Sequence, residues 1–534
     1  MNALSIVILS LCSIYMLLNF KHDIHMLQQN SYRPERYWRW MRGDGDWSSV
    51  WRLVDLAMIF LLMASNLLPF QVASLLIAIV CTTKIFLILG RKFKKPLVFT
   101  RRVWRIYSLT GLLALGAVIP VALCTAGKTY AAIYAGFQIT LLVILGVSAL
   151  SWMVVMIALY LLMPVEKSIN ARYRNDAIRI LRSMPALKVV GITGSYGKTS
   201  TKHFLQRILS EQYETLMTPG SFNTPMGVIR TIREYLQPYT EVFICEMGAK
   251  QPGDIKEICD MVHPNAGIIT AVGPMHLETF KSIENVQSTK FELADAIPQD
   301  GFVVVNNDFE ACASRIVNNA ECIRYAITNP KDADYLAKDI KYSAEGTDFT
   351  IVCPDGTELA FHTRLVGECN VSNLLGAIIV ALKMGVAEEK IRIAVSKIEP
   401  VEHRLSIVHA PSGITIIDDA FNSNPSGAKM ALDVLSQFSG GKRIIVTPGM
   451  IELGERQFAL NKALGRYIGE KVDVAVIVGR HNREALLEGL SNGPIPEENI
   501  HVVDTFDEAR RLLAEKMRSG DTVLYENDLP DSFK

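Results

Sequence analysis

Long apolar runs fill the first third of this 534-residue chain and set the first constraint on its fold. Asn2–Phe20 is uncharged, lacks the marks of a removable signal, and is followed by similar runs at Leu53–Pro69, Phe70–Leu89 and Ile106–Thr125. Each is close to the ~20 residues that cross a bilayer as a helix. Tyr130–Met163 is longer and could form one span or two. The pattern predicts an α-helical membrane region over residues 1–165 with about five spans.

Positive charge is concentrated in two of the connections between these runs. It is carried by Lys21, Arg33, Arg36, Arg39, Arg42 and Arg52, and then by Arg91, Lys92, Lys94, Lys95, Arg101, Arg102 and Arg105. Loops rich in Lys and Arg stay in the cytoplasm, so the bias predicts a multi-pass plasma-membrane protein whose amino terminus lies outside. Five spans, favoured over six, place everything from Glu166 onward in the cytoplasm. Asp55 and Lys84 lie near predicted span ends, which favours snorkelling to the interface over a transport role.

The overall charge and the cysteines exclude two further classes of protein. The formal net charge of +1 gives no electrostatic case for nucleic-acid binding. The nine cysteines form no Cys-x-x-Cys pair and no zinc-type cluster with histidine. They are predicted to be reduced thiols rather than a disulfide framework.

A glycine loop follows the membrane region and predicts a nucleotide-triphosphate site. Its residues are Thr193, Gly194, Ser195, Gly197, Lys198, Thr199 and Ser200. Backbone N–H groups of such a loop can wrap a phosphate, the lysine can reach the outer phosphates, and the following hydroxyl can bind Mg²⁺. The commonest motif of this kind requires glycine at the position of Ile192, so the variant that matches is Thr-Gly-x-x-Gly-Lys-Thr.

Short β-rich runs alternate with helical ones after an amphiphilic linker at 166–186. Strands are expected at 187–192, 242–246, 266–270 and 302–306, and the alternation predicts a mostly parallel sheet covered by helices. Stricter alternation at about 321–366, with Asp355-Gly356, predicts a small antiparallel insertion. A second α/β series begins after Pro400, so we expect domains at 187–399 and 400–534 with a site between them.

Polar residues follow several of the predicted strands, where an open α/β sheet binds its ligands. Glu246 ends one strand, His276 follows another, and Asp418-Asp419 ends a third. A carboxylate and an imidazole near a phosphate loop are plausible Mg²⁺ ligands or groups that orient a phosphoryl acceptor. Taken one at a time, each has a structural role as its simpler interpretation. Asn422 and Asn424 in particular suit a turn and a helix cap.

The order of these blocks resembles the Mur ligases, the ATP-dependent amino-acid ligases that build the peptidoglycan stem peptide. The resemblance covers about 189–525 and is greatest to the members that add D-alanyl-D-alanine. The blocks are the glycine loop, Met217–Gly227, Glu246–Gly248, Gly253–Ile255, His276–Glu284, Lys290, Asn306–Asp308, Gly367–Asn373, Arg404, Asp418–Pro425 and Glu452–Gly454. The resemblance implies a P-loop central domain and a Rossmann-like C-terminal domain.

The resemblance also implies a role for each block. Lys198 would contact the outer phosphates of ATP, Thr199 and Glu246 would bind one Mg²⁺, and His276 with a carbamylated Lys290 would bind a second. Asn306 and Asn370 would contact adenine, Asp419 the ribose and Arg404 the γ-phosphate. Asn223, Asn422 and Asn424 would contact the substrate. Lys198, His276, Lys290 and Arg404 form the implied catalytic set.

Departures from the family pattern concern the substrate more than ATP. Membrane spans and a short linker stand where a UDP-binding domain usually precedes the loop. Cys369, His403, Phe421 and Asn461 replace the customary His, Gly, Tyr and His. Tyr525–Asp531 stands where a Lys-Gly-Ser loop is expected. The carboxylate substrate, whether nucleotide- or lipid-linked, is therefore left open.

Three functions follow from the sequence. The leading hypothesis is a membrane-anchored ligase that activates a cell-wall peptide precursor as an acyl phosphate and joins it to D-alanyl-D-alanine or a similar amine. The alternative is a related ligase for another polymer, such as poly-γ-glutamate or a lipid-linked peptide. A membrane nucleotidase or transporter is less favoured. The expected partners are the precursor, an amino acid or dipeptide, and membrane lipid.

Overall fold

A computed structural model of the chain describes residues 3–43, 50–63, 69–91, 93, 95–124, 130–275, 277–343, 346–421, 423–491 and 493–528. These residues fall into two compact units, one within residues 1–170 and one over Ala171–Leu529.

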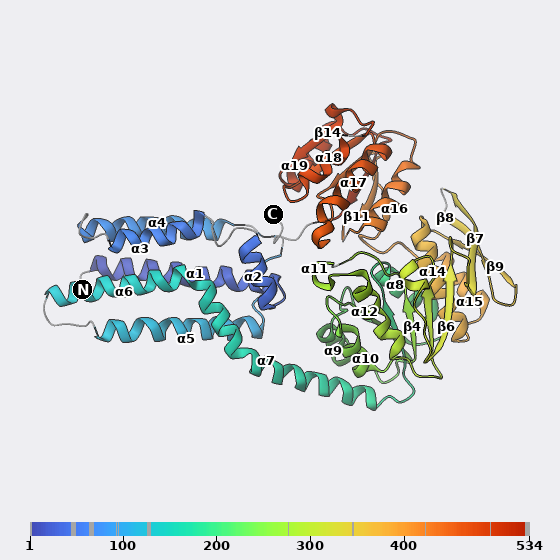
Figure 1. Cartoon of the computed structure of the whole chain (residues 1–534), viewed down its shortest axis with the longest axis horizontal. Coiled ribbons are helices and arrows are strands. Elements are labelled where there is room, and N and C mark those ends of the chain that lie inside the picture. Colours follow the sequence, from blue (N-terminus) through green and yellow to red (C-terminus); the bar gives the residue numbers. More distant parts are fainter. Residues whose placement is uncertain are drawn as a thin grey trace. The chain divides into compact units, whose positions relative to one another are not determined.

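The described residues of the first unit form helices and no strands (Figure 1). They are α1 (Ala3–Gln29), α2 (Pro34–Gly43), α3 (Val50–Met63), α4 (Phe70–Gly90), α5 (Arg101–Cys124), α6 (Tyr130–Ala149) and the start of α7 (Ser151–Arg182). Among the described residues, four helices are long and apolar enough to cross a membrane, namely α1, α4, α5 and α7. The apolar run Tyr130–Met163 is interrupted at Leu150, so it forms two helices. The linker expected at 166–186 is mostly the continuation of α7.

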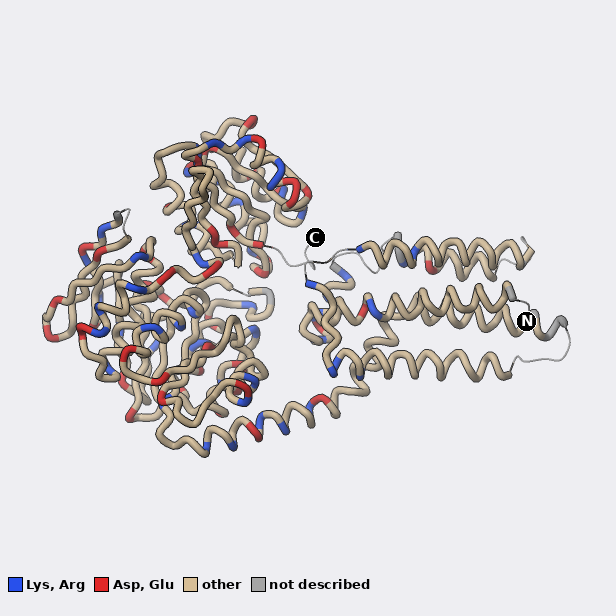
Figure 2. Tube along the Cα trace, turned by 180° about the vertical axis from the view of Figure 1, so that it is seen from behind, with Lys and Arg blue, Asp and Glu red and all other residues tan. Residues whose placement is uncertain are grey.

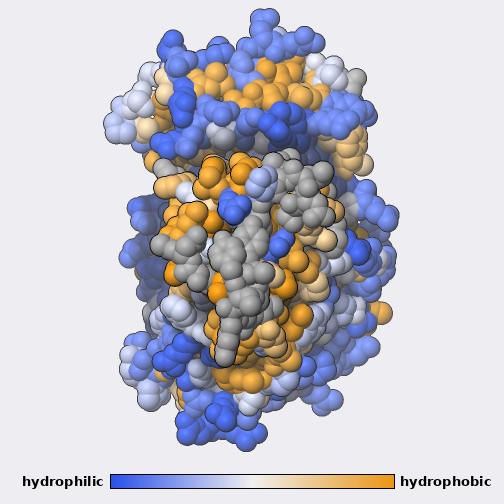
Figure 3. All heavy atoms as spheres, turned by 90° about the vertical axis from the view of Figure 1, so that its left-hand side faces the viewer, coloured by the Kyte–Doolittle hydropathy of each residue, from blue (hydrophilic) through white to orange (hydrophobic). Residues whose placement is uncertain are grey.

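Apolar side chains cover much of the surface of this helical unit. Phe60, Phe86 and Leu123 are 70%, 71% and 70% exposed, and Figure 3 shows a broad apolar face. Few charged residues lie along the helices of this unit (Figure 2). A surface of this kind is expected where the surrounding solvent is lipid.

Two ion pairs are buried inside the helical unit, and they correct the snorkelling prediction. Lys84 Nζ lies 2.6 Å from Asp55 Oδ1 and 2.7 Å from the Tyr15 hydroxyl, and both charged residues are buried. A second pair joins Arg52 to Asp23 at 2.7 Å, with Ser151 hydrogen-bonded to both. Pairing inside the bundle satisfies these charges without bringing them to the interface.

A nine-stranded sheet forms the core of the second unit's central part. Its strands are β1 (Lys188–Thr193), β2 (Thr215–Met217), β3 (Val242–Glu246), β4 (Ala266–Ile269), β5 (Phe302–Asn306), β6 (Glu321–Ala326), β7 (Tyr335–Ser343), β8 (Gly346–Val352) and β9 (Glu358–Thr363). The order is β2-β3-β1-β4-β5-β6-β7-β8-β9, parallel from β2 to β7 and antiparallel from β7 to β9. The region predicted as a small antiparallel insertion is antiparallel from β7 to β9, but it continues the main sheet, since β6 pairs in parallel with β5.

Helices cover both faces of this sheet because successive strand residues point to opposite sides. One face packs against α8 (Lys198–Leu209), α14 (Glu368–Lys383) and α15 (Glu388–Ser396). The other packs against α9 (Pro225–Glu234), α10 (Asp254–Val262), α12 (Ile283–Asp295) and the last turns of α7. The short helices α11 (Leu277–Phe280) and α13 (Glu310–Ala313) flank α12.

A six-stranded sheet follows, with the order β10-β11-β15-β12-β13-β14. The strands are β10 (Ser406–His409), β11 (Thr415–Asp419), β12 (Arg443–Thr447), β13 (Val474–Val478), β14 (Ile500–Val503) and β15 (Thr522–Glu526), and only β10 is antiparallel to its neighbour. Helices α16 (Pro425–Ser436), α17 (Gln457–Lys471) and α18 (Arg483–Leu490) pack on one face, and α19 (Phe506–Lys516) on the other. Two 3₁₀ turns, η1 (Gly454–Arg456) and η2 (Glu497–Asn499), complete the order. The predicted second α/β series is present; its Rossmann-like character stays a prediction.

Candidate active site

The glycine loop joins the end of β1 to the start of α8. Gly194 and Gly197 have φ angles of +151° and +76°, which L side chains rarely adopt. A Cβ on Gly197 would also lie 2.2 Å from Asn373 Oδ1. The loop is fixed by Ser195, whose N–H donates to Ala271 O at 2.7 Å. The backbone thus forms an anion cradle at a helix amino end, as the sequence predicts.

Lys198 lies folded over this cradle. Its Nζ donates to Gly194 O at 2.6 Å, in the loop itself. Its pKa is lowered to about 8, chiefly by burial; Glu246 opposes the shift and Arg404 adds to it. A phosphate in the loop would supply the counter-charge that this ammonium lacks.

Thr199 and Glu246 meet beside the cradle because β1 and β3 are neighbouring parallel strands. The Thr199 hydroxyl lies 3.2 Å from Glu246 Oε2, and Asn223 Nδ2 donates to Glu246 Oε1 at 2.9 Å. A hydroxyl and a carboxylate are oxygen ligands of the kind that Mg²⁺ takes, so the pair fits a metal at this position. Asn223 thus holds the carboxylate, and its predicted contact with substrate stays a prediction.

Lys202 is a site residue that the sequence prediction missed. It lies one turn after Lys198 on α8, is 0% exposed, and places Nζ 3.0 Å from Glu246 Oε2. Burial raises the pKa of Glu246, but the charges of Lys202 and Lys198 outweigh it and leave that pKa below its usual value. The spacing of four residues from Lys198 was the available signal, because it puts both lysines on one helix face.

Lys290 is buried on α12, and it is 3% exposed. Burial, assisted by the charge of Lys198, lowers its pKa well below the usual range for lysine. A neutral buried amine is the form that could take up CO₂, so the residue fits the predicted carbamate. His276, its predicted partner at the second metal, lies outside the described residues.

Asn306 and Asn370, the two residues predicted to contact adenine, each donate hydrogen bonds to other residues of the chain. Asn306 Nδ2 donates to Thr270 O at 2.9 Å and to Ser372 Oγ at 3.0 Å. Asn370 Nδ2 donates to Val366 O at 2.8 Å. Both residues are buried, and their contact with adenine stays a prediction.

Arg404 and Asp419 lie at the start of the C-terminal sheet. Burial lowers the pKa of Arg404, and the charges of Asp419 and Glu246 oppose that shift. The Arg404 guanidinium lies 3.9 Å from the ring centre of Phe421. The Leu405 N–H donates to Asp419 Oδ1 at 3.1 Å, and burial raises the pKa of Asp419 to about 6.

The two asparagines that follow Asp419 have different outcomes. Asn424 is the N-cap of α16, and its Oδ1 accepts from the Gly427 N–H at 2.8 Å. This contact gives it the helix-capping role that was the simpler interpretation. Asn422 lies outside the described residues.

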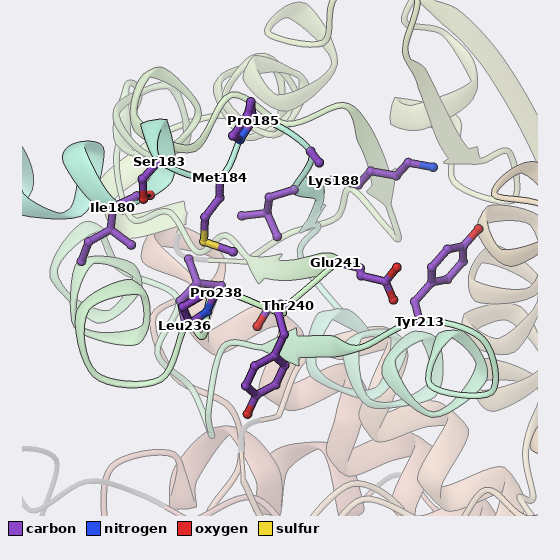
Figure 4. Close-up of a pocket in the computed structure, with 13 residues that line it drawn as sticks. Ile180, Ser183, Met184, Pro185, Lys188, Tyr213, Leu236, Pro238, Thr240 and Glu241 are labelled. Atoms are coloured by element: carbon purple, nitrogen blue, oxygen red, sulfur yellow. Dashed lines mark hydrogen bonds between the residues drawn. The ribbon is translucent and has the colours of Figure 1, made fainter.

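A pocket of 540 Å³ lies at the amino ends of the strands of the central sheet, opposite the glycine loop (Figure 4). Lys188 and Glu241, at the amino ends of β1 and β3, line it together with Met184, Tyr213 and Tyr239. The glycine loop follows the carboxyl end of β1, so this pocket is separate from the candidate active site.

Comparisons with known proteins agree with this site. The "Mur ligase middle domain" model matches residues 192–381, and the "Mur ligase, glutamate ligase domain" model matches 403–525. The UDP-N-acetylmuramoyl-tripeptide--D-alanyl-D-alanine ligase of Mycobacterium tuberculosis is 32% identical over 371 residues, which are 63% of this chain and 70% of the relative. The Bacillus subtilis enzyme of the same name is 29% identical over 345 residues, covering 64% and 72%.

Solved structures give the same result. MurF from Acinetobacter baumannii superposes with a TM-score of 0.60 at 25% identity, covering 67% of this chain and 77% of that one. MurF from Thermotoga maritima in complex with ADP has a TM-score of 0.60 at 23% identity, covering 67% and 80%. With the phosphate loop, Thr199 and Glu246 placed as described, these matches show that the chain belongs to the Mur ligase family of ATP-dependent amide-bond ligases.

Proposed function

We propose that this chain joins D-alanyl-D-alanine, or a similar amine, to a muramyl-peptide precursor at the cytoplasmic face of the plasma membrane. The observation that carries the proposal is the cluster of Lys198, Thr199 and Glu246 at the carboxyl ends of β1 and β3. The curated relatives that match are named for this reaction.

The residues fit the steps that such a reaction needs. A carboxylate is a poor electrophile, so the γ-phosphoryl group of ATP is first transferred to it, giving an acyl phosphate. The amine then attacks the acyl carbon, and phosphate leaves. Most of the help required is neutralisation of charge and positioning.

Charge neutralisation is assigned to named residues. Lys198 holds the outer phosphates, and Arg404 stabilises the transferred group from the C-terminal domain. Mg²⁺, when bound by Thr199 and Glu246, neutralises phosphate charge. A second Mg²⁺ is assigned to His276 and carbamylated Lys290, while Asn306, Asn370 and Asp419 are assigned to adenine and ribose.

The helical unit supports the membrane part of the proposal. Its long apolar helices suit a multi-span region at about 1–165 with the amino terminus outside. Helix α7 then leads to ligase domains at about 187–399 and 400–534 in the cytoplasm, where ATP is.

Phosphate release by the full-length protein in detergent tests the reaction class. We expect release from ATP only when UDP-muramyl tripeptide and D-alanyl-D-alanine are both present. Hydroxylamine should replace the amine and yield a hydroxamate, because it traps an activated carboxylate. A rate of ATP hydrolysis that does not depend on either substrate, with no hydroxamate formed, would indicate a nucleotidase or transporter instead.

A lipid-linked or other polymer precursor is the second candidate. The observation that favours it is the apolar helical unit, which lies before the first residue matched by the family models, residue 192. Running the same assay with a lipid-linked muramyl peptide separates the two. Preference for the lipid-linked acceptor would favour this candidate, and preference for the UDP-linked one would exclude it.

A further inference from the structure

Glu526 ends the central strand of the C-terminal sheet and lies beside Asp419. Strand β15 pairs in parallel with β11, and the register sets Glu526 directly against Asp419. Both carboxyl groups therefore stand at the carboxyl edge of this sheet, where α/β sheets bind ligands.

One oxygen of Glu526 is left without a partner. The residue is 0% exposed, and its Oε1 accepts a hydrogen bond from the Ser423 hydroxyl. Its Oε2 is buried and has no hydrogen-bond partner among the described residues. A buried carboxylate oxygen without a hydrogen-bond partner lowers the stability of the fold. Such an oxygen in a native protein calls for an explanation, and binding of a ligand is one.

The charge around Glu526 is negative. Burial and the neighbouring charge of Asp419 raise the pKa of Glu526 well above its usual value, and the hydrogen bond from Ser423 opposes them only in part. Arg404 opposes the rise in the pKa of Asp419. A cation bound at Glu526 would stabilise the ionised form of its carboxyl group.

The position adjoins the phosphate site. Asp419 acts on Arg404, and Arg404 acts in turn on Lys198 of the glycine loop. A group bound at Glu526 would thus lie on the C-terminal side of the transferred phosphoryl group. The second substrate must approach the acyl phosphate from outside the nucleotide.

We propose that Glu526, with Asp419 beside it, binds the ammonium group of the incoming amine substrate. An ammonium has three N–H donors and a full positive charge, which match the free Oε2 and the local negative charge. The inference rests on the proposed ligase function and names a specificity-determining residue for it.

Steady-state kinetics of Glu526→Gln test the assignment. Amide formation from UDP-muramyl tripeptide and D-alanyl-D-alanine is measured with the full-length protein in detergent. The variant keeps the shape of the side chain but loses its charge. The KM for D-alanyl-D-alanine should rise on the order of 10- to 100-fold, the range expected for a lost charged hydrogen bond, with the KM for ATP unchanged. Glu526→Asp should have a smaller effect.

Asp528→Asn is the matched control, since it removes the same charge from an exposed carboxylate two residues away. Its amine KM should equal that of the wild type. Equal effects of the two substitutions, or a Glu526→Gln change confined to the KM for ATP, would overturn the inference. If Glu526→Gln no longer binds ADP because it misfolds, Ser423→Ala decides. Losing the Ser423 hydrogen bond, which lowers the pKa of Glu526, favours the neutral carboxyl group and should raise the amine KM severalfold, and an unchanged KM overturns the inference. A wild type that forms no amide with any acceptor would instead refute the ligase proposal, and this inference with it.

Discussion

At the scale of single residues, the proposed role of Lys290 depends on a covalent modification, carbamylation of its amine. Burial lowers the pKa of its amine, which favours the neutral form that reacts with CO₂. Lys290→Ala should abolish amide formation, and a small carboxylate such as acetate should restore part of it by replacing the carbamate. The rescue is measured as activity against acetate concentration. Full activity of Lys290→Ala without acetate would contradict the assignment.

Lys202 should act through Glu246 rather than on the substrate. Lys202→Met would leave Glu246 buried without its closest cation, at a cost of about 3–5 kcal/mol. Hydrogen exchange of the β3 amides measures this as a lower free energy of opening. The control is Lys256→Met, which breaks an exposed pair with Asp260 and should cost less than about 1 kcal/mol. Equal free energies of opening of the β3 amides in the two variants would show that the Lys202–Glu246 pair does not stabilise β3.

Asp419 makes stability depend on pH. Its folded-state pKa, about 6, lies above the ordinary value of 3.8, so the folded chain favours the protonated form. The stabilisation is complete below pH 3.8 and is lost as pH rises through about 6. Asp419→Asn mimics the protonated form and should be more stable than the wild type at pH 7.5, by about 3 kcal/mol at most. Thermal midpoints between pH 5 and 7.5 measure this, and a constant difference across that range would contradict it.

The residue types of the ATP site could be predicted, but not all of their contacts. Thr199 and Glu246 come together as expected, because each ends or follows a strand of the same parallel sheet. The amides of Asn223 and Asn424 bind Glu246 and cap α16, contacts that the sequence did not specify, and their contact with substrate stays a prediction. The sequence shows that an asparagine side chain is present, but it does not show which group that side chain will hydrogen-bond.

At the scale of elements, the turn from β1 into α8 should tolerate no side chain at Gly197. Gly197→Ala combines a positive φ with a clash against Asn373 and should weaken ADP binding by at least about tenfold, as the cradle shifts. Gly479→Ala is the matched control, with φ +78° and nothing within 4 Å of the new Cβ. Both pay about 1–2 kcal/mol for the backbone conformation, but only the first should change ADP affinity in calorimetry. Equal ADP affinities would rule out the clash as the cause.

Strand prediction succeeded where burial on both faces gives short β-branched runs. Strands β3 and β5 have the predicted bounds, Val242–Glu246 and Phe302–Asn306. The parallel pairing of β6 with β5 was missed because strand partners are chosen in three dimensions, whereas alternation alone suggested a small antiparallel insertion. The sequence left open whether Tyr130–Met163 forms one segment or two, because the residues on both sides of the break at Leu150 are apolar.

At the scale of the whole molecule, the division into an apolar helical unit and an α/β unit follows directly from composition. The pairing of the buried charges inside the helical unit does not follow from composition. Asp55, Lys84 and Tyr15 come from three helices, so their pairing could not be deduced from position along any one of them. Their buried network means that the helical unit is held together by more than apolar contact.

The central claim is that the chain forms an amide bond at the expense of ATP. The most direct measurement is mass spectrometry of the product made by the full-length protein from ATP, UDP-muramyl tripeptide and D-alanyl-D-alanine, with Lys198→Met as the inactive control. The account predicts a product whose mass equals the sum of the two substrates less one water, with one ADP and one phosphate formed for each. ADP formation with no amide, from this acceptor or from its lipid-linked form, would contradict it.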